Sequence, residues 1–262
     1  MENSLTEPTP RRIVYSSSPM PVSMTDCWYN IANLEHFWIR RRFDVLRRLA
    51  DPFIRAAGCV GEIGCGNGLL QRDIEDHYGI KVTGFDLNEF ALQQNVSRLS
   101  RLHCYDIHQR SAEFEAQFDA LLLFDVLEHI DDEAAFLQSV KFHLAPSGLL
   151  LINVPAHRFL YSRYDRAAGH VRRYGIRHLT HVAQTNGLRV RAWTYWGLPL
   201  VPLLLARKVL VGFQREEKAI ISLGFDSGGK ASNAALALLS RFEPLPQRIL
   251  GTSLMAILER AA

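Results

Sequence analysis

The feature that most constrains this chain is a glycine turn in the stretch Val60-Gly61-Glu62-Ile63-Gly64-Cys65-Gly66-Asn67-Gly68-Leu69-Leu70. Gly64 and Gly66 allow the backbone to turn sharply and to approach a ligand without a Cβ in the way. The N–H groups that begin the following helix suit an anionic group. Glu62, just before the turn, would repel a pyrophosphate but would attract a cation or a hydroxyl. The stretch therefore predicts a strand, a tight turn and a helix that together bind a nucleotide-like ligand.

Apolar runs and helical patterns alternate along the rest of the chain. Strands are expected at 59–63, 81–85, 101–105, 120–124, 149–154, 189–194 and 253–259. Helices are expected at about 25–49, 68–77, 88–99, 131–144, 176–187, 200–211 and 234–240. Strands that alternate with helices favour a parallel sheet with right-handed crossovers. We predict an α/β fold with a Rossmann-like, seven-stranded, mostly parallel sheet and helices on both of its faces.

Composition divides the chain into a tail, a cap and one large domain. Residues 1–24 are rich in Pro, Ser and Thr and lack an apolar core segment, so we expect a disordered tail without a signal peptide. Residues 25–57 predict a helical cap that begins at Thr25 or Asp26. Its outward face is expected to carry Arg40, Arg41, Arg42, Arg47 and Arg48.

The main domain is expected to span residues 58–262 and to contain two long connections. The stretch at about 155–175 lacks a regular pattern but is rich in aromatic and basic residues, which favours a lid over a substrate. The polar stretch at about 214–232 contains Gly228-Gly229 and predicts a mobile loop.

Charge and cysteine usage exclude several classes of protein. The chain has 30 basic and 27 acidic residues, a net charge of +3, which is too mild to indicate a nucleic-acid partner. Its four cysteines form no CxxC pair and are expected to be reduced thiols. The apolar stretch 196–213 contains two prolines, Arg207 and Lys208, so it predicts an amphipathic surface element rather than a membrane span.

Three acidic residues lie at or near predicted strand ends, namely Glu62, Asp86 and Asp106. Open α/β sheets bind their ligands at these ends. Asp86 can accept hydrogen bonds from both hydroxyls of a ribose, and Asp106 from an exocyclic adenine amine. A nicotinamide cofactor would require G-x-G-x-x-G, but here the third glycine comes one residue early. A P-loop is excluded because no Gly-Lys-Ser/Thr follows the turn. A plain tight turn with satisfied acids is the structural alternative.

Together with the later segment Phe124-Asp125-Val126-Leu127-Glu128-His129-Ile130, these residues resemble the class I S-adenosylmethionine-dependent methyltransferases. The resemblance covers roughly residues 58–155. Two further segments, 160–174 and Glu35-His36-Phe37-Trp38, look like a bacterial subgroup that often acts in glycan, lipid or natural-product pathways. This resemblance implies a cytoplasmic enzyme that methylates a small-molecule or glycan/lipid-linked acceptor. Oxygen is the expected target, and the enzyme can contact the inner membrane peripherally.

The resemblance also implies which residues hold S-adenosylmethionine. The turn from Glu62 to Gly66 would hold its methionine part, Asp86 its ribose, and Asp106 with Ile107 its adenine. Apolar contacts would come from Leu87 over the adenine, from Phe124 beside the sulfonium and from Trp38, which would close over the cofactor. The cofactor set is Glu62, Gly64, Cys65, Gly66, Asp86, Leu87, Asp106, Ile107, Phe124 and Trp38. Trp38 could equally be an ordinary core aromatic.

Two histidines are candidate catalytic bases. His129 and His157 follow the strands whose ends flank the donor methyl in this fold, and a neutral imidazole can accept a proton near physiological pH. The alternative is that each histidine only holds a strand-end loop together. The Asp125-x-x-Glu128-His129 spacing resembles a metal cluster in some ubiquinone-pathway and small-RNA methyltransferases, but also the same segment in metal-free relatives. We expect no metal here.

The insertion is expected to supply the acceptor site through Tyr161, His170, Arg173 and Tyr174. An arginine there could grip a phosphate or carboxylate, and the tyrosines could stack on a sugar or ring. The alternative is an internal salt-bridge network between Asp165 and the arginines that only shapes the lid. The acceptor, the methylated atom and the oligomeric state are left open by the sequence.

A non-catalytic S-adenosylmethionine-binding module, a sensor or scaffold of the same fold, is the second functional class. It would keep Glu62, Asp86 and Asp106, so these residues cannot separate it from an enzyme. Transfer to nucleic acid is disfavoured, because Phe124-Asp125-Val126-Leu127 stands where an Asn/Asp-Pro-Pro-Tyr-type motif would be expected.

Overall fold

The structure is a computed structural model that describes residues 13–21, 32–213, 220 and 229–261. The expected helix start at Thr25 or Asp26 lies outside the described residues. The same holds for most of the stretch 214–232, for which a mobile loop was expected.

Eight strands form one sheet in the order β1-β4-β3-β2-β5-β6-β8-β7. Neighbouring strands from β1 to β6 are parallel, and β8 runs antiparallel to both β6 and β7. In chain order the strands are β1 (Ile13–Tyr15), β2 (Val60–Ile63), β3 (Val82–Asp86), β4 (Arg101–Cys104), β5 (Phe118–Phe124), β6 (Leu144–Pro155), β7 (Leu188–Trp196) and β8 (Ser253–Arg260). The predicted mostly parallel α/β sheet is confirmed.

Strand β1 was not among the seven expected strands, and its presence corrects the expectation of a disordered tail. Ile13–Tyr15 pairs in parallel with Leu102–Cys104 at the edge of the sheet. Ser16 and Ser17 continue the contact by donating their backbone N–H groups to the Cys104 carbonyl. A three-residue edge strand is too short to show a hydrophobic period, because what stabilises it is backbone pairing with a strand distant in sequence.

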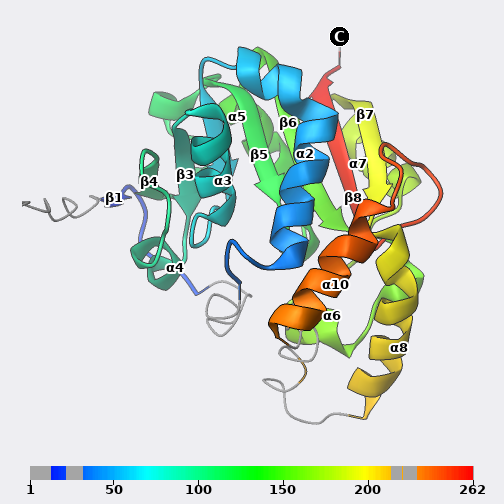
Figure 1. Cartoon of the computed structure of the whole chain (residues 1–262). Helices are drawn as coiled ribbons and strands as arrows, with labels where there is room; N and C mark the ends of the chain where they lie inside the picture. Colours follow the sequence, from blue (N-terminus) through cyan, green and yellow to red (C-terminus); the bar gives the residue numbers. More distant parts are fainter. Residues whose placement is uncertain (1–12, 22–31, 214–219, 221–228, 262) are drawn as a thin grey trace, which may run out of the picture.

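Helices cover both faces of the sheet, as predicted (Figure 1). The α-helices are α2 (Phe37–Ala56), α3 (Leu69–Tyr78), α4 (Glu89–Gln93), α5 (Glu133–His143), α6 (Arg163–Ala167), α7 (Ile176–Thr185), α8 (Val201–Gly212) and α10 (Lys230–Arg241). Short 3₁₀ turns are η1 (Ile107–Gln109), η2 (Ala112–Phe114), η3 (Leu127–His129), η4 (Arg158–Leu160) and η5 (Leu198–Leu200).

The central strand β5 shows why both faces need helices. Leu121 and Leu123 point into a core cluster with α5 and α7, whereas Ala120 and Leu122 point into a second cluster with α2 and α3. Successive side chains of a strand face opposite sides. A strand buried on both sides therefore has the continuous apolar sequence seen here.

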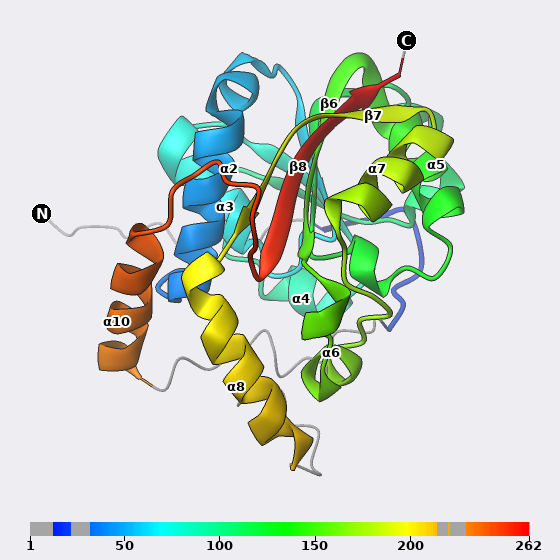
Figure 2. The ribbon, with the colours of Figure 1, turned by 90° about the vertical axis from the view of Figure 1, so that its right-hand side faces the viewer.

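Helix α8 and helix α10 lie beyond the carboxyl end of the parallel strands, at the same end of the molecule as α6 (Figure 2). Helix α10 packs against α2 and η5, and α8 packs against α6 and η4. Within the described ranges, no helix is both long and apolar enough to cross a membrane.

Candidate active site

The glycine turn is held in the left-handed backbone region that favours glycine. Gly64 has a φ of 72° and Gly66 a φ of 51°. A Cβ at Gly64 would lie 2.3 Å from the Cγ2 atom of Val126, so a side chain has no room there. The N–H groups of Gly64 and Cys65 both donate to the Phe85 carbonyl, at 2.8 and 3.1 Å. The turn between β2 and α3 is therefore fixed by the neighbouring strand β3.

Glu62 is a buried carboxyl just before this turn. Its side chain is 3% exposed, and its Oε2 atom has no hydrogen-bond partner among the described residues. The pKa of Glu62 is raised to about 8, with burial as the largest cause. The nearby Arg42 charge acts to lower this pKa, and the charges of Asp86 and Asp125 act to raise it. An unpartnered buried oxygen of this kind calls for an unseen donor. A ligand ammonium fits that requirement, because it would supply both a donor and a compensating charge.

Asp86 ties the turn to the next helix. One carboxylate oxygen accepts from the Gly66 N–H at 2.7 Å, and the other accepts from the Asn88 N–H at 2.8 Å. Burial raises the pKa of Asp86, and these backbone bonds lower it, leaving a net rise. Each carboxylate oxygen retains a further acceptor position, so Asp86 can also meet a pair of ligand hydroxyls. Leu87 beside it is half-buried and packs on a small apolar cluster that contains Cys65.

Asp106 and Ile107 follow β4 at the same edge of the sheet. Asp106 caps η1 by accepting from the His108 N–H at 2.9 Å, while its own N–H donates to the Ser17 hydroxyl. Ile107 is buried in the hydrophobic core. Contact between Ile107 and an adenine would therefore have to use mainly its backbone.

Arg42 joins the turn to the strand-end segment after β5, and the sequence analysis missed it. Its guanidinium forms an ion pair with Asp125. The same group lies 5.0 Å from the Trp38 ring centroid and 5.5 Å from that of Phe124, within the range of cation–π attraction. Arg42 and Arg41 are both buried, which corrects their expected place on an outward face. The spacing of four between Trp38 and Arg42, one helical turn, is the signal that could have revealed the pair.

Asp125 has an unusual backbone and is held by several partners. Its φ is 57°, and its N–H donates to the Asn153 carbonyl. The Asn153 amide donates to Asp125 Oδ1 at 2.7 Å and accepts from the Trp196 indole at 2.9 Å. Left-handed backbone in a non-glycine residue is uncommon and persists where the surroundings impose it. This network aims the Asp125 carboxylate into a cavity.

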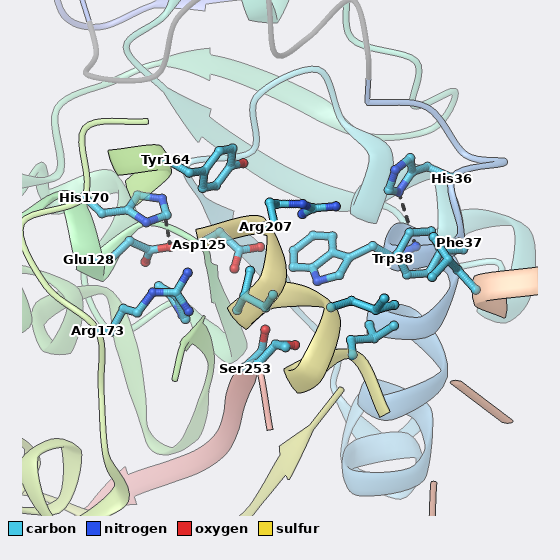
Figure 3. A pocket seen from close by; sticks show the side chains of 16 residues that line it. His36, Phe37, Trp38, Asp125, Glu128, Tyr164, His170, Arg173, Arg207 and Ser253 are labelled. Atoms are coloured by element: carbon cyan, nitrogen blue, oxygen red, sulfur yellow. Dashed lines mark hydrogen bonds and ion pairs between the residues drawn. The ribbon is translucent and has the colours of Figure 1, made fainter. Parts of the chain in front are cut away.

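The cavity, of about 150 Å³, lies between the strand ends and helices α2, α8 and α10 (Figure 3). Its lining combines polar side chains with several leucines. Its lining residues are His36, Phe37, Trp38, Asp125, Glu128, Pro155, Tyr164, His170, Arg173, Leu200, Leu203, Leu204, Arg207, Leu236, Thr252 and Ser253. Of the predicted site residues, it brings together Trp38, His170 and Arg173. Tyr164, one of the tyrosines of the 155–175 connection that were expected to stack on a ring, also lines it. Asp125 and Arg207 are lining residues that the sequence analysis did not select.

Asp165 does not line the cavity itself but binds two residues that do, His170 and Arg173. It is fully buried and accepts from His170 Nδ1 at 3.1 Å and from Arg173 Nε at 2.6 Å. Burial raises the pKa of Asp165, but the His170 hydrogen bond and the Arg173 charge outweigh burial, so its pKa falls below the usual value. This is the internal network that the sequence analysis gave as the alternative to an anion grip. The other ring nitrogen of His170, Nε2, lies 4.0 Å from Glu128 Oε1.

The other predicted residues lie outside the cavity. His129 places Nδ1 3.2 Å from the Gly169 carbonyl and its ring edge-on to His170; burial and the His170 charge lower its pKa to about 4. His157 packs on Tyr195 with 4.4 Å between ring centroids, and burial lowers its pKa. Neither is among the described residues that line the cavity. These contacts favour the alternative that the two histidines hold strand-end loops together, and their direct catalytic role stays a prediction.

The two predicted tyrosines have hydrogen-bond partners within the protein. Tyr174 is fully buried, and its hydroxyl donates to Glu133 Oε1 at 2.6 Å. Tyr161 donates its hydroxyl to the His170 carbonyl at 2.7 Å. The burial of Tyr174 leaves its ring no surface for a ligand. Tyr161 is half-buried, so its expected contact with the acceptor stays a prediction.

A group of three residues in this region could hold a divalent metal. Ligand atoms of Glu128, His129 and His170 all lie within 4.8 Å of one another. Both carboxyl oxygens of Glu128 are buried without a hydrogen-bond partner among the described residues, and burial raises the pKa of Glu128 well above its ordinary value. Carboxylate and imidazole ligands suit several divalent ions. The expectation of a metal-free site therefore needs a direct test.

Sequence comparison matches the chain to a methyltransferase family model and to proteins named as methyltransferases. A family model described as a methyltransferase domain matches residues 33–192. A protein of Mycolicibacterium smegmatis named probable S-adenosylmethionine-dependent methyltransferase is 31% identical over 163 residues, 60% of this chain and 61% of that protein. A ubiquinone biosynthesis O-methyltransferase of Aromatoleum aromaticum is 33% identical over 124 residues, 42% of this chain and 50% of that protein. The chain thus spans 50–61% of the length of these two relatives.

Solved structures share the fold at low sequence identity. A structure titled SAM dependent methyltransferase from Archaeoglobus fulgidus has a TM-score of 0.54 at 19% identity and covers 84% of this chain and 94% of its own. A structure titled [4+2]-cyclase SpnF has a TM-score of 0.55 at 15% identity and covers 94% of this chain and 100% of its own. At these identities the likeness concerns the fold alone.

Proposed function

We infer that this chain, which belongs to the methyltransferase-domain family, transfers a methyl group from S-adenosylmethionine to an oxygen atom of a small-molecule or glycan/lipid-linked acceptor. The predicted family is confirmed by the family match. The named relatives support the enzyme class and the methyl donor, which are proposed here together with the oxygen target and the acceptor class. We also propose a cytoplasmic location.

The single observation that carries the proposal is the unpartnered Glu62 oxygen beside the glycine turn. S-adenosylmethionine, when bound, supplies a methyl group already activated by its sulfonium and carries an ammonium that Glu62 would meet. Asp86 would accept from the ribose hydroxyls with the acceptor positions that its two backbone bonds leave. Residues of this chain therefore fit the cofactor at two of its polar groups.

Alignment of the acceptor is the larger task of the protein, because a sulfonium methyl needs little further activation. The ion pair of Arg42 with Asp125 supports this role, because it links helix α2 to the polar lining of the cavity. Trp38 lines the cavity while stacking against that guanidinium. We propose that Trp38 and Asp125 hold the acceptor against the donor side of the site.

A hydroxyl acceptor must also lose a proton, and we propose that His170 Nε2 receives it. The support is its place in the cavity wall and its Nδ1 hydrogen bond to the ionised Asp165, which orients the ring and stabilises the imidazolium that forms. His129, packed edge-on against His170, becomes a positioning residue. This assignment replaces the one expected from the sequence.

The test is turnover. Purified protein with methyl-tritiated S-adenosylmethionine and a bacterial lipid and metabolite extract should transfer label to an organic product. Mass spectrometry and NMR of that product should show a methyl ether or ester. Calorimetric binding of the cofactor without label transfer in any fraction would instead support a non-catalytic binding module. Label on nitrogen or carbon would contradict the oxygen assignment and leave the enzyme class intact.

A further inference from the structure

Helix α8 is apolar almost all round, yet little of it is covered. Its sequence VPLLLARKVLVG buries only Val201 and Val211 among the described residues. Val209 is 62% exposed and Leu210 57%. Phe213, which follows the helix, is 81% exposed. A helix with this composition is normally buried on most sides.

Neighbouring elements extend this apolar surface. Leu238 and Leu239 of α10 are exposed, as are Phe242 directly after it and Phe159 of η4. Both views of the ribbon place α8 and α10 at the same end of the molecule (Figures 1 and 2). We call the following exposed set the apolar end: Phe159, Leu203, Leu205, Val209, Leu210, Phe213, Leu238, Leu239 and Phe242. A patch of this kind marks an interaction site more often than an inert surface.

The four described elements that carry or border the apolar end, η4, α6, α8 and α10, are rich in basic residues. Basic residues of η4, α6, α8 and α10 are Arg158, Arg163, Arg166, Arg207, Lys208, Lys230 and Arg241. The single acid in these four elements is Asp165, which is buried and paired with Arg173 and His170. Lys208 reaches along the surface to donate to the Phe159 carbonyl at 2.7 Å. Apolar side chains flanked by exposed basic ones, here Arg158, Arg166, Lys230 and Arg241, match an anionic lipid surface.

The same helices wall the cavity. Leu203 and Leu204 of α8 and Leu236 of α10 line it together with the polar residues that Figure 3 labels, such as Asp125 and His170. Leu203 is also 47% exposed, so the apolar wall continues from the cavity to the apolar end. A ligand with an apolar chain could pass along this wall and present its polar head to the strand ends.

We propose that the apolar end docks on an anionic lipid bilayer and that the methyl acceptor is an amphiphile drawn from it. The acceptor part of this inference rests on the proposed function; the docking part does not. Helix α8 has 12 residues, about 18 Å of helix, against roughly 30 Å of hydrocarbon core. It therefore rests in the interfacial layer and does not span the bilayer.

Vesicle co-sedimentation of the full chain tests the docking. The wild-type protein should bind vesicles of phosphatidylcholine mixed with phosphatidylglycerol more strongly than vesicles of phosphatidylcholine alone. Leu210→Asp should lower the partition coefficient at least about tenfold, because a charge replaces an inserted leucine. Leu99→Asp is the matched control: Leu99 is 54% exposed and follows α4, away from the apolar end, and its substitution should change nothing. A thermal midpoint for each variant confirms folding.

Three outcomes would overturn the docking. Binding that is equal for wild type and Leu210→Asp would show that the apolar end is not the contact. Failure of the wild-type protein to bind either kind of vesicle would contradict the docking as well. A wild-type dimer in light scattering that becomes monomeric in Leu210→Asp, without vesicle binding, would assign this surface to a second copy of the chain.

The docking and the proposed function fail separately. Vesicle binding without label transfer to any lipid or metabolite fraction would contradict the methyl transfer and leave the docking standing. Label transfer confined to water-soluble metabolites would contradict the amphiphilic acceptor. If vesicles carrying the lipid extract accelerate label transfer for wild type but not for Leu210→Asp, both parts are supported.

Discussion

The two halves of the site are built in different ways. In the cofactor half, the acids bind backbone N–H groups close in sequence or on the adjacent strand, as Asp86 does with Gly66 and Asn88. In the proposed acceptor half, side chains meet across long separations, as Arg42 meets Asp125. The first half can be recognised from a motif, since the motif carries its own backbone geometry. The second depends on how the elements pack.

The largest effect is expected at His170, which lines the cavity and is the proposed proton acceptor. His170→Ala should lower kcat about 10³-fold by removing the proton acceptor, while the dissociation constant for S-adenosylmethionine stays unchanged. Single-turnover label transfer and calorimetry measure the two quantities. His181→Ala, at an exposed histidine of α7, is the control and should retain activity. A joint loss of cofactor binding in His170→Ala would place this residue in the cofactor half.

A second, smaller effect concerns the rigidity of the turn. Gly64→Ala should lower the free energy of unfolding by about 3 kcal/mol, because a positive φ and a clash with Val126 both oppose a Cβ. Gly79→Ala is a matched control: its φ is 69°, but a Cβ there would meet nothing within 4 Å. It should cost only about 1 kcal/mol. Equal losses in urea unfolding would show that the close approach of Val126 is unimportant.

The buried carboxyl of Glu62 gives a pH-dependent prediction. Its folded pKa of about 8 is raised above 4.5, so its contribution to stability is fully present below pH 4.5 and is lost as the pH rises through 8. Between pH 5 and 8, ligand-free wild type should lose on the order of 2 kcal/mol relative to Glu62→Gln. Thermal unfolding at several pH values checks this.

The same variant should behave in the opposite way toward the cofactor. Glu62→Gln should bind S-adenosylmethionine roughly tenfold more weakly at pH 8, because it cannot supply a charge to the ammonium. Wild-type affinity should rise with pH toward 8, and the affinity of the variant should stay flat. A variant that is neither more stable at pH 8 nor weaker in binding would break the assigned role of Glu62.

The smallest effect is expected from chelation. We expect activity to survive EDTA, because the proposed reaction uses His170 Nε2 as a proton acceptor and involves no metal. Label transfer before and after EDTA, with Mg²⁺ restored, measures this. A loss that Mg²⁺ reverses would instead make Glu128, His129 and His170 ligands of a metal, consistent with their spacing within 4.8 Å. The acceptor half would then depend on an ion and not on a base.

Most of the fold follows from patterns that the chain carries locally. The seven expected strands and the helices on both faces are present, because a strand buried on both sides must be continuously apolar. Strand β1 was missed, since its three residues depend on pairing with β4. The burial of Arg41 and Arg42 was missed as well, because their acidic partners lie 202 and 83 residues away.

The sequence by itself determined the glycine turn and the acids at the strand ends, and their resemblance to a known family implied the methyl donor. Those features act through backbone geometry and through neighbours in sequence, so residue identity and spacing are sufficient to read them. Tertiary structure alone decided that His170, rather than His129 or His157, lines the cavity, and that Tyr174 faces the core. Where a side chain points at the end of a long connection depends on what packs behind it, here Asp165, and no local pattern encodes that contact.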